Sequence, residues 1–115
     1  MSTTQYLFFP HNVEKTPSFI SDQEFDRYTN ANIDMYCISP THVLTCLVDP
    51  QGLLPPNKLL QGYGGLFERL TGDVVIVNEG TTQYSTVEEF LSSLPSILEE
   101  DAKKRQRFIS RLSGL

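Results

Sequence analysis

The stretch Asp73-Val74-Val75-Ile76-Val77 decides the fold of this 115-residue chain. Its four consecutive β-branched residues favour an extended strand, and the lack of a polar residue among them indicates burial on both faces. Thr71-Gly72 precedes the run and Asn78-Glu79-Gly80 follows it, so residues typical of turns bound it on both sides. We therefore expect this stretch to form the central strand of a sheet.

Three further segments are rich in the aromatic and β-branched residues that strands favour. They span residues 5–9, 33–38 and 43–48. The polar segment 11–18 is expected to be a loop, and Ser39-Pro40-Thr41-His42 suits the turn of an antiparallel hairpin. Asp49-Pro50-Gln51-Gly52 then has the residue order of a type I turn.

Helix signals occur in two places before residue 80. Ser21 and Glu24 are spaced as a capping box, so a short helix is expected over residues 22–29. Asn57 is placed to cap a shorter helical segment through Leu60.

The C-terminal segment 85–112 has helical periodicity. Ser85 and Glu88 are spaced as another capping box, and apolar residues recur at intervals of three and four. Pro95 interrupts this pattern, which is compatible either with a kink or with a second helix that begins at the proline.

These elements predict a single α+β domain over residues 1–115, near the commonest domain size. A sheet-containing body is expected over residues 1–80, followed by the C-terminal helical segment. The sheet is expected to be small, mixed or antiparallel, and packed against the short helix and the C-terminal segment.

The charges of the chain are unevenly distributed. Residues 1–102 hold fourteen acids and four bases (−10), and residues 103–115 hold five bases and no acid (+5), which gives the net charge of −5. An acidic body repels phosphate backbones, so nucleic-acid binding is disfavoured and a partner protein with a basic surface is expected. Apolar runs are short and no signal-peptide pattern is present, which argues against a membrane span and for a cytoplasmic location.

The two cysteines, Cys37 and Cys46, are too few for a disulfide scaffold, and we expect both to be reduced and buried. With His42 they are candidate metal ligands, but the chain has no C-x-x-C pair and no fourth ligand at suitable spacing. In a hairpin that turns at Pro40-Thr41, Cys46 faces Met35 rather than Cys37. We therefore expect no metal and no other cofactor.

No set of residues forms a recognisable catalytic motif, so an enzyme is not expected. The glycine cluster Gly62-Tyr63-Gly64-Gly65 matches neither phosphate-binding pattern, and no lysine follows it. His11 and His42, the only histidines, lie in no nucleophile motif. A protein that binds a small ligand or a nucleotide with this glycine loop and one histidine is the alternative from another functional class.

Two surfaces are candidates for contacts with other proteins. The residues expected to bind a basic partner are Asp22, Glu24, Asp26, Asp34, Glu79, Glu88 and Glu89. The residues expected to join copies of the chain in a structural homo-oligomer are Ile97, Leu98, Phe108, Ile109 and Leu112.

Other charged and aromatic residues have a structural interpretation beside a functional one. The basic cluster Lys103, Lys104, Arg105, Arg107 and Arg111 could contact an acidic partner, but three of its members follow acids by four residues, as in ion pairs along a helix. Tyr63, Phe67 and Tyr84 either line an interface or complete the core.

Three stretches carry a resemblance to a known family: Leu47-Val48-Asp49-Pro50-Gln51-Gly52-Leu53-Leu54, then Pro56-Asn57, then Thr71-Gly72-Asp73-Val74-Val75-Ile76-Val77. In this order they resemble a small domain of unknown function found in phages and plasmids, over about residues 43–78. The resemblance implies a mobile-element accessory protein without an established activity, and it carries over no catalytic residue. By analogy with small acidic phage proteins, it suggests a regulator or inhibitor that binds a host protein, in the host cytoplasm.

Overall fold

The computed structural model describes residues 4–113, with the side chains of residues 4–100 and 103. Its strands form one sheet in the order β2-β1-β5-β4-β3, with every neighbouring pair antiparallel. The strands are β1 (Gln5–Phe9), β2 (Ser18–Ile20), β3 (Ile33–Cys37), β4 (His42–Leu47) and β5 (Val74–Asn78). The helices are α1 (Asp22–Thr29), α2 (Lys58–Gln61), the 3-10 helix η1 (Gly65–Arg69) and α3 (Val87–Ser113). The chain therefore has the predicted α+β fold.

Strand β5 is the central strand, as its sequence predicts. All five of its residues are buried, because β1 and β4 pair with its two edges and helices cover both faces of the sheet. Ile76 lies opposite Leu7 of β1 and Leu44 of β4. This row of aliphatic side chains crosses the three middle strands and forms the centre of the core.

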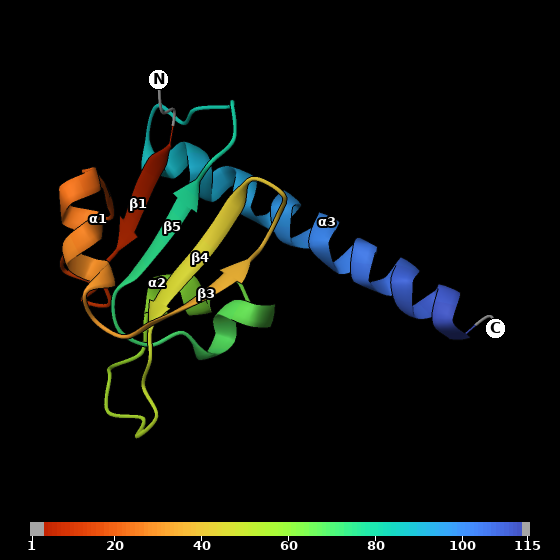
Figure 1. Cartoon of the computed structure of the whole chain (residues 1–115), viewed down its shortest axis with the longest axis horizontal. Coiled ribbons are helices and arrows are strands. Elements are labelled where there is room, and N and C mark those ends of the chain that lie inside the picture. The colour runs from red at the N-terminus through yellow and green to blue at the C-terminus, as the bar shows by residue number, and fades with distance from the viewer. Residues whose placement is uncertain (1–3, 114–115) are drawn as a thin grey trace.

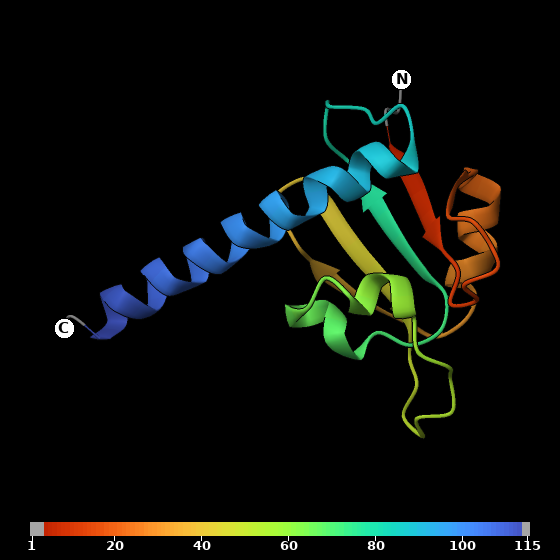
Figure 2. The same cartoon turned by 180° about the vertical axis from the view of Figure 1, so that it is seen from behind.

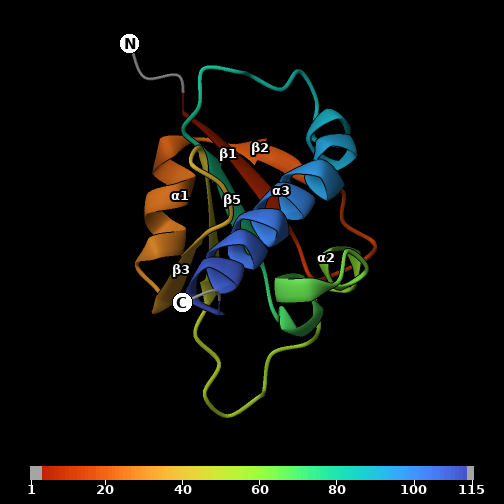
Figure 3. The same cartoon turned by 90° about the vertical axis from the view of Figure 1, so that its right-hand side faces the viewer.

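The helices form layers on the two faces of the sheet (Figures 1, 2 and 3). Alternate residues of a strand point to opposite faces, and β1 shows which helix covers each one. The ring of Phe9 lies 6.0 Å from that of Phe90 in α3, whereas the ring of Tyr6 stacks at 4.5 Å on that of Phe25 in α1. Helices α3 and α2 and η1 thus cover one face, and α1 covers the other.

The main core lies between the sheet and α3, α2 and η1. Its fully buried members include Leu7, Phe9, Leu44, Leu60, Phe67, Val74, Ile76, Phe90 and Leu94. Burial of each such side chain contributes about 1.5–3 kcal/mol relative to exposure. The sequence left open whether Tyr63, Phe67 and Tyr84 line an interface or complete the core. Phe67 and Tyr84 belong to this core, and the partly buried Tyr63 packs against it.

Besides the stacking of Phe25 on Tyr6, hydrogen bonds of Tyr28 hold helix α1 on the opposite face. The hydroxyl of Tyr28 lies 2.8 Å from the carbonyl oxygen of Asp73 and 3.2 Å from that of Thr45. The hydroxyl of Thr45 in turn donates to the Val75 carbonyl at 2.6 Å. The predicted capping box is present, because Ser21 Oγ accepts from the Glu24 amide and Glu24 Oε1 accepts from the Ser21 amide.

Two details of the sheet differ from the sequence prediction. Strand β2 was missed because its three residues begin inside the segment expected to be a loop, and they pair only with β1 at the edge of the sheet. The register of the β3–β4 hairpin was wrong by one residue, since Cys46 lies opposite Asp34 and not Met35. The reason is a tight turn centred on residue 40, in which the His42 carbonyl accepts from the Ile38 amide at 3.1 Å.

The C-terminal segment forms one helix, so no second helix begins at Pro95. Helix α3 passes through Pro95 without a break in its helical assignment. Its cap is shifted by one residue from the predicted Ser85–Glu88 box: Thr86 Oγ1 accepts from the Glu89 amide, and Glu89 Oε2 accepts from the Ser85 amide. The predicted ion pair at a spacing of four is present between Lys103 Nζ and Glu99 Oε1, at 3.2 Å.

Candidate functional site

The charges of three of the seven predicted partner-binding acids act on the hydroxyl of Tyr6. Burial raises the pKa of the Tyr6 hydroxyl, the charge of Asp22 and its hydrogen bonding raise it further, and the charges of Asp26 and Glu79 add to this effect. Asp22 and Asp26 come from α1, and Glu79 directly follows β5. All three carboxylates are exposed, whereas the Tyr6 ring is half-buried against Phe25. We call these five residues the Tyr6 cluster.

The other four predicted acids are also exposed but serve other parts of the fold. Glu24 and Glu89 accept hydrogen bonds from backbone amides at the N-terminal ends of α1 and α3. Glu88 lies in the first turn of α3, where a negative charge interacts favourably with the helix dipole. Asp34 lies on the edge strand β3, which β4 and β5 separate from β1, and its charge acts on Cys46.

His42 is held in a buried hydrogen-bonded network. Its Nε2 lies 3.0 Å from the Tyr84 hydroxyl, and its Nδ1 lies 2.8 Å from Ser39 Oγ and 3.0 Å from Thr41 Oγ1. Burial lowers the pKa of His42, and burial together with the charge of Glu89 raises the pKa of Tyr84. Both side chains are therefore neutral at neutral pH, and both imidazole nitrogens are used within the fold.

His11 is paired with an aspartate beside the central strand. Asp73 Oδ1 lies 2.8 Å from His11 Nδ1 and accepts from the His11 amide at 3.0 Å. Both side chains are a little over one third exposed. The pair joins the loop after β1 to the residue directly before β5, so a structural role accounts for it.

The two cysteines differ in environment. Cys46 is buried, as expected, and burial and the charge of Asp34 raise the pKa of its thiol. Cys37 is exposed, contrary to expectation, because β3 is an edge strand. In the β3–β4 register Cys37 pairs with Val43, so its side chain is on the opposite face from those of Cys46 and His42. Among the side chains that the structure describes, no group of three potential ligands is arranged to hold a metal ion.

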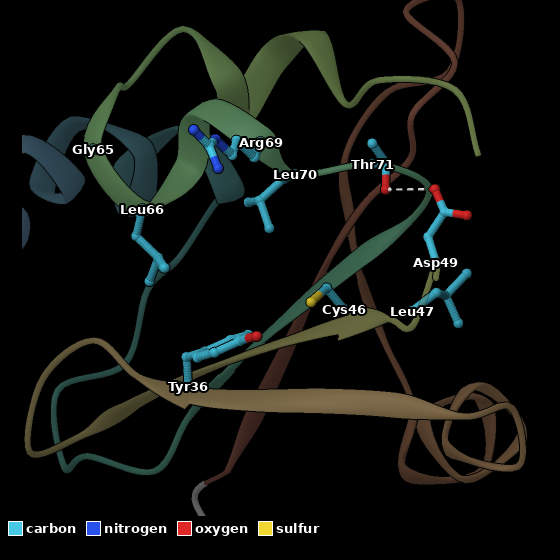
Figure 4. A pocket seen from close by; sticks show the side chains of 9 residues that line it. All are labelled: Tyr36, Cys46, Leu47, Asp49, Gly65, Leu66, Arg69, Leu70 and Thr71. Atoms are coloured by element: carbon cyan, nitrogen blue, oxygen red, sulfur yellow. Dashed lines mark hydrogen bonds between the residues drawn. The ribbon is translucent and has the colours of Figure 1, made fainter. Parts of the chain in front are cut away.

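The glycine cluster borders a hollow of about 390 Å³ between η1 and the β3–β4 hairpin (Figure 4). Gly64 and Gly65 have φ angles of 76° and 56°, and this left-handed backbone turns the chain into η1. Arg69 and Tyr36 line the hollow, while Asp49, at its rim, accepts from Thr71 and from two amides of its own turn. Neither histidine lines this hollow, so the combination of the glycine loop with a histidine is not formed there.

The predicted oligomerisation residues divide between the body and the distal half of α3. Ile97 and Leu98 are half-buried and pack against the core. Positions 108, 109 and 112 are helical, but their side chains lie outside the described ones, as do those of Lys104, Arg105, Arg107 and Arg111. Lys103 of the basic cluster is exposed.

Sequence reasoning missed two features of these sites. Tyr6 was interpreted only as a strand residue. Its position two residues before the Phe8-Phe9 pair is the one sequence signal that could have suggested a contact with the helix that begins at Asp22. Tyr84 was considered only for its aromatic ring. Its hydroxyl is hydrogen-bonded to His42, which is 42 residues away in the chain, so no local sequence pattern indicates this bond.

Among the residues that the structure describes, no helix has the length and the hydrophobicity that a membrane crossing requires. Searches of protein-family models, curated proteins and solved structures found no match to this chain.

Proposed function

We propose that this chain is a non-enzymatic protein-binding module that recognises a basic protein surface through the Tyr6 cluster. The observation that carries the proposal is that the charges of three exposed carboxylates act on the hydroxyl of one half-buried tyrosine, whose ring stacks on that of Phe25. Carboxylates attract basic side chains over long distances and increase the rate of encounter. The residues before position 103 add to this attraction, because they carry −10 in total.

The aromatic rings of the cluster favour arginine over a bare positive charge. Tyr6 and Phe25 are stacked with an interplanar angle of 22° and centroids 4.5 Å apart. A guanidinium group can stack on such a ring while its N–H groups bond to a neighbouring carboxylate. Each exposed cation–π contact contributes about 0.5–1 kcal/mol, so the cluster combines charge attraction with a preference for arginine.

Both histidines and Cys46 are engaged within the fold, and Cys37 is the exposed thiol. His42 has both ring nitrogens hydrogen-bonded, and His11 is paired with Asp73. The thiol of Cys46 is buried with a raised pKa, which disfavours the nucleophilic thiolate.

The resemblance to a phage and plasmid domain suggests what such a module would do. A small acidic protein of a mobile element could regulate or inhibit a host protein by covering a basic surface on it. This setting would place the chain in the host cytoplasm, and the proposal needs no cofactor.

The test is to compare two triple variants that lose the same amount of negative charge. One carries Asp22→Asn, Asp26→Asn and Glu79→Gln in the Tyr6 cluster. The control carries Glu14→Gln, Glu68→Gln and Glu88→Gln, which are exposed and do not act on Tyr6. Binding is measured by calorimetry against a short Arg-rich peptide and a Lys-rich peptide of the same length, at low and moderate salt.

The cluster variant should lose at least about tenfold in affinity for the Arg-rich peptide, equivalent to about 1.4 kcal/mol. The control should lose much less, and the Lys-rich peptide should bind more weakly to the unmodified chain. Equal losses in the two variants would show that the total charge alone acts, and would overturn the proposal. Capture from a lysate of the natural host with the unmodified and cluster-variant chains would then identify the partner.

A further inference from the structure

Helix α3 is longer than the body that it covers. Its 27 residues span about 40 Å at 1.5 Å per residue. Phe90 and Leu94 are fully buried and Ile97 and Leu98 half-buried, so the first half packs on the sheet. The distal half continues past the edge of the sheet at β3 (Figures 1 and 2).

Six apolar residues of α3 are arranged symmetrically about residue 103. A regular helix places positions 94, 97, 98, 108, 109 and 112 within an arc of about 120° on one face. These six positions form three pairs, 94 with 112, 97 with 109 and 98 with 108. The two members of each pair are equally far from residue 103 along the chain. The pairs are Leu94 with Leu112, Ile97 with Ile109 and Leu98 with Phe108. Leu94 is fully buried in its own body, so the other two pairs are the ones open to a second copy. A stripe with this symmetry maps onto itself when a second copy is turned end to end.

Charged residues of α3 are also placed symmetrically about residue 103, and the two members of each pair have opposite charges. Asp101 and Arg105 fall on the same face, at equal distances from residue 103. In an antiparallel pair of helices, Asp101 of each copy meets Arg105 of the other, and Glu100 lies near Lys104 of the other copy. A parallel pair would bring like charges together at each of these positions. The charge pattern therefore selects the antiparallel arrangement.

The body offers a place for the end of a second helix. A hollow of about 690 Å³ lies between the β3–β4 turn and α3. It is lined by Ile38, Pro40, the half-buried Ile97 and Glu100, among others. An antiparallel partner helix would bring its residue 109 next to Ile97 and thus to this hollow.

We propose that two copies of this chain associate through an antiparallel pairing of their α3 helices, with the two-fold axis at residue 103. The interface consists of the apolar positions 97, 98, 108 and 109, the Asp101–Arg105 contacts and the hollow beside the β3–β4 turn. Closed two-fold symmetry limits the assembly to a dimer.

The first test compares two aspartate substitutions in adjacent residues of the full-length chain. Ile109→Asp places a charge in the stripe, and Ser110→Asp places the same charge on the opposite face of the helix. Both positions lie beyond the part of α3 that packs on the body, so the fold should be retained, which circular dichroism can verify. Sedimentation equilibrium should give a dimer for the unmodified chain and for Ser110→Asp, and a dissociation constant at least about tenfold higher for Ile109→Asp. A monomeric unmodified chain, or equal behaviour of the two variants, would overturn the proposal.

The second test measures the orientation of the helices. A spin label at Ser113→Cys, in a Cys37→Ser background, marks the last residue of α3. In the antiparallel dimer the two labelled positions are twenty residues apart along the axis, or about 30 Å. A parallel dimer would place them about 10 Å apart, the distance between packed helix axes. Pulsed electron paramagnetic resonance separates these values, and the short distance would refute the antiparallel arrangement.

Discussion

Asn57 joins three parts of the fold, and its substitution by aspartate tests how buried polar groups hold the body together. The side chain is fully buried, and its Nδ2 donates to the carbonyl oxygens of Phe9 and Gly72, both at 3.0 Å. Its Oδ1 accepts from the Leu60 amide at 3.3 Å and caps α2. Asn57→Asp keeps the shape and the cap, but it replaces the donor by an oxygen that faces two carbonyl oxygens.

The expected loss of stability follows from these contacts. Each of the two hydrogen bonds contributes about 1 kcal/mol net, and each buried carbonyl left without a donor costs about 1–3 kcal/mol. A buried carboxylate adds a desolvation cost, so we expect Asn57→Asp to lower the free energy of unfolding by at least about 3 kcal/mol at pH 7. This is a large part of the 5–15 kcal/mol typical of a domain.

Urea unfolding monitored by circular dichroism measures this loss, with the exposed Asn32→Asp as the control that should stay within about 0.5 kcal/mol. Burial and the two facing carbonyls raise the pKa of the introduced carboxyl group, so its cost should grow as pH rises through the unfolded-state pKa near 3.9. The difference between variant and parent should therefore be smaller at pH 4 than at pH 7. A loss below about 1 kcal/mol, or one that does not change with pH, would refute the assignment of Nδ2 as donor to both carbonyls.

Two further predictions concern titratable side chains of the sheet. Burial lowers the pKa of His42, so its imidazole binds a proton more tightly in the unfolded chain than in the folded one. The free energy of unfolding should therefore decrease as pH falls below about 6.5, the pKa of an unperturbed histidine. The drop in unfolding free energy between pH 7 and pH 5 should thus be smaller in His42→Gln, and an unchanged drop would contradict this. Cys37 is exposed and Cys46 is buried with a raised pKa, so a thiol reagent should modify Cys37 in the folded chain at least about tenfold faster. Cys37→Ser and Cys46→Ala assign the two rates, and equal rates would argue against the burial of Cys46.

Local sequence patterns predicted the elements whose signals lie within a few residues. The run from Val74 to Val77 identified the central strand, and the Ser21–Glu24 spacing identified α1 and its cap. The cap of α2 was also visible in the sequence, because Asn57 precedes a short run of helix-forming residues. In each case the decisive hydrogen bonds or burial pattern are local to the element.

Features that depend on distant parts of the chain could not be predicted in the same way. The two carbonyl acceptors of Asn57 lie on residues 9 and 72, and neither is marked by its own side chain. Strand β2 exists because β1 offers it an edge, not because its three residues have a strong strand pattern. The Tyr6 cluster likewise needs β1, α1 and the end of β5 to be adjacent, which only the strand order establishes.

The separation of charge along this chain admits two kinds of self-association, and the symmetry of α3 distinguishes them. In the first kind, the basic residues after position 102 of one copy bind the Tyr6 cluster of the next. Each copy then uses two different surfaces, and such head-to-tail contacts extend into open chains unless they close into a ring. The proposed pairing of α3 instead places Lys104 and Arg105 beside Glu100 and Asp101 of the second copy, so that the dimer closes and these two bases are neutralised within it. The Tyr6 clusters would then remain free, one on each copy. A dimer of this kind would present two acidic surfaces to a basic partner, and a partner with repeated basic segments would bind it with higher avidity than a single copy.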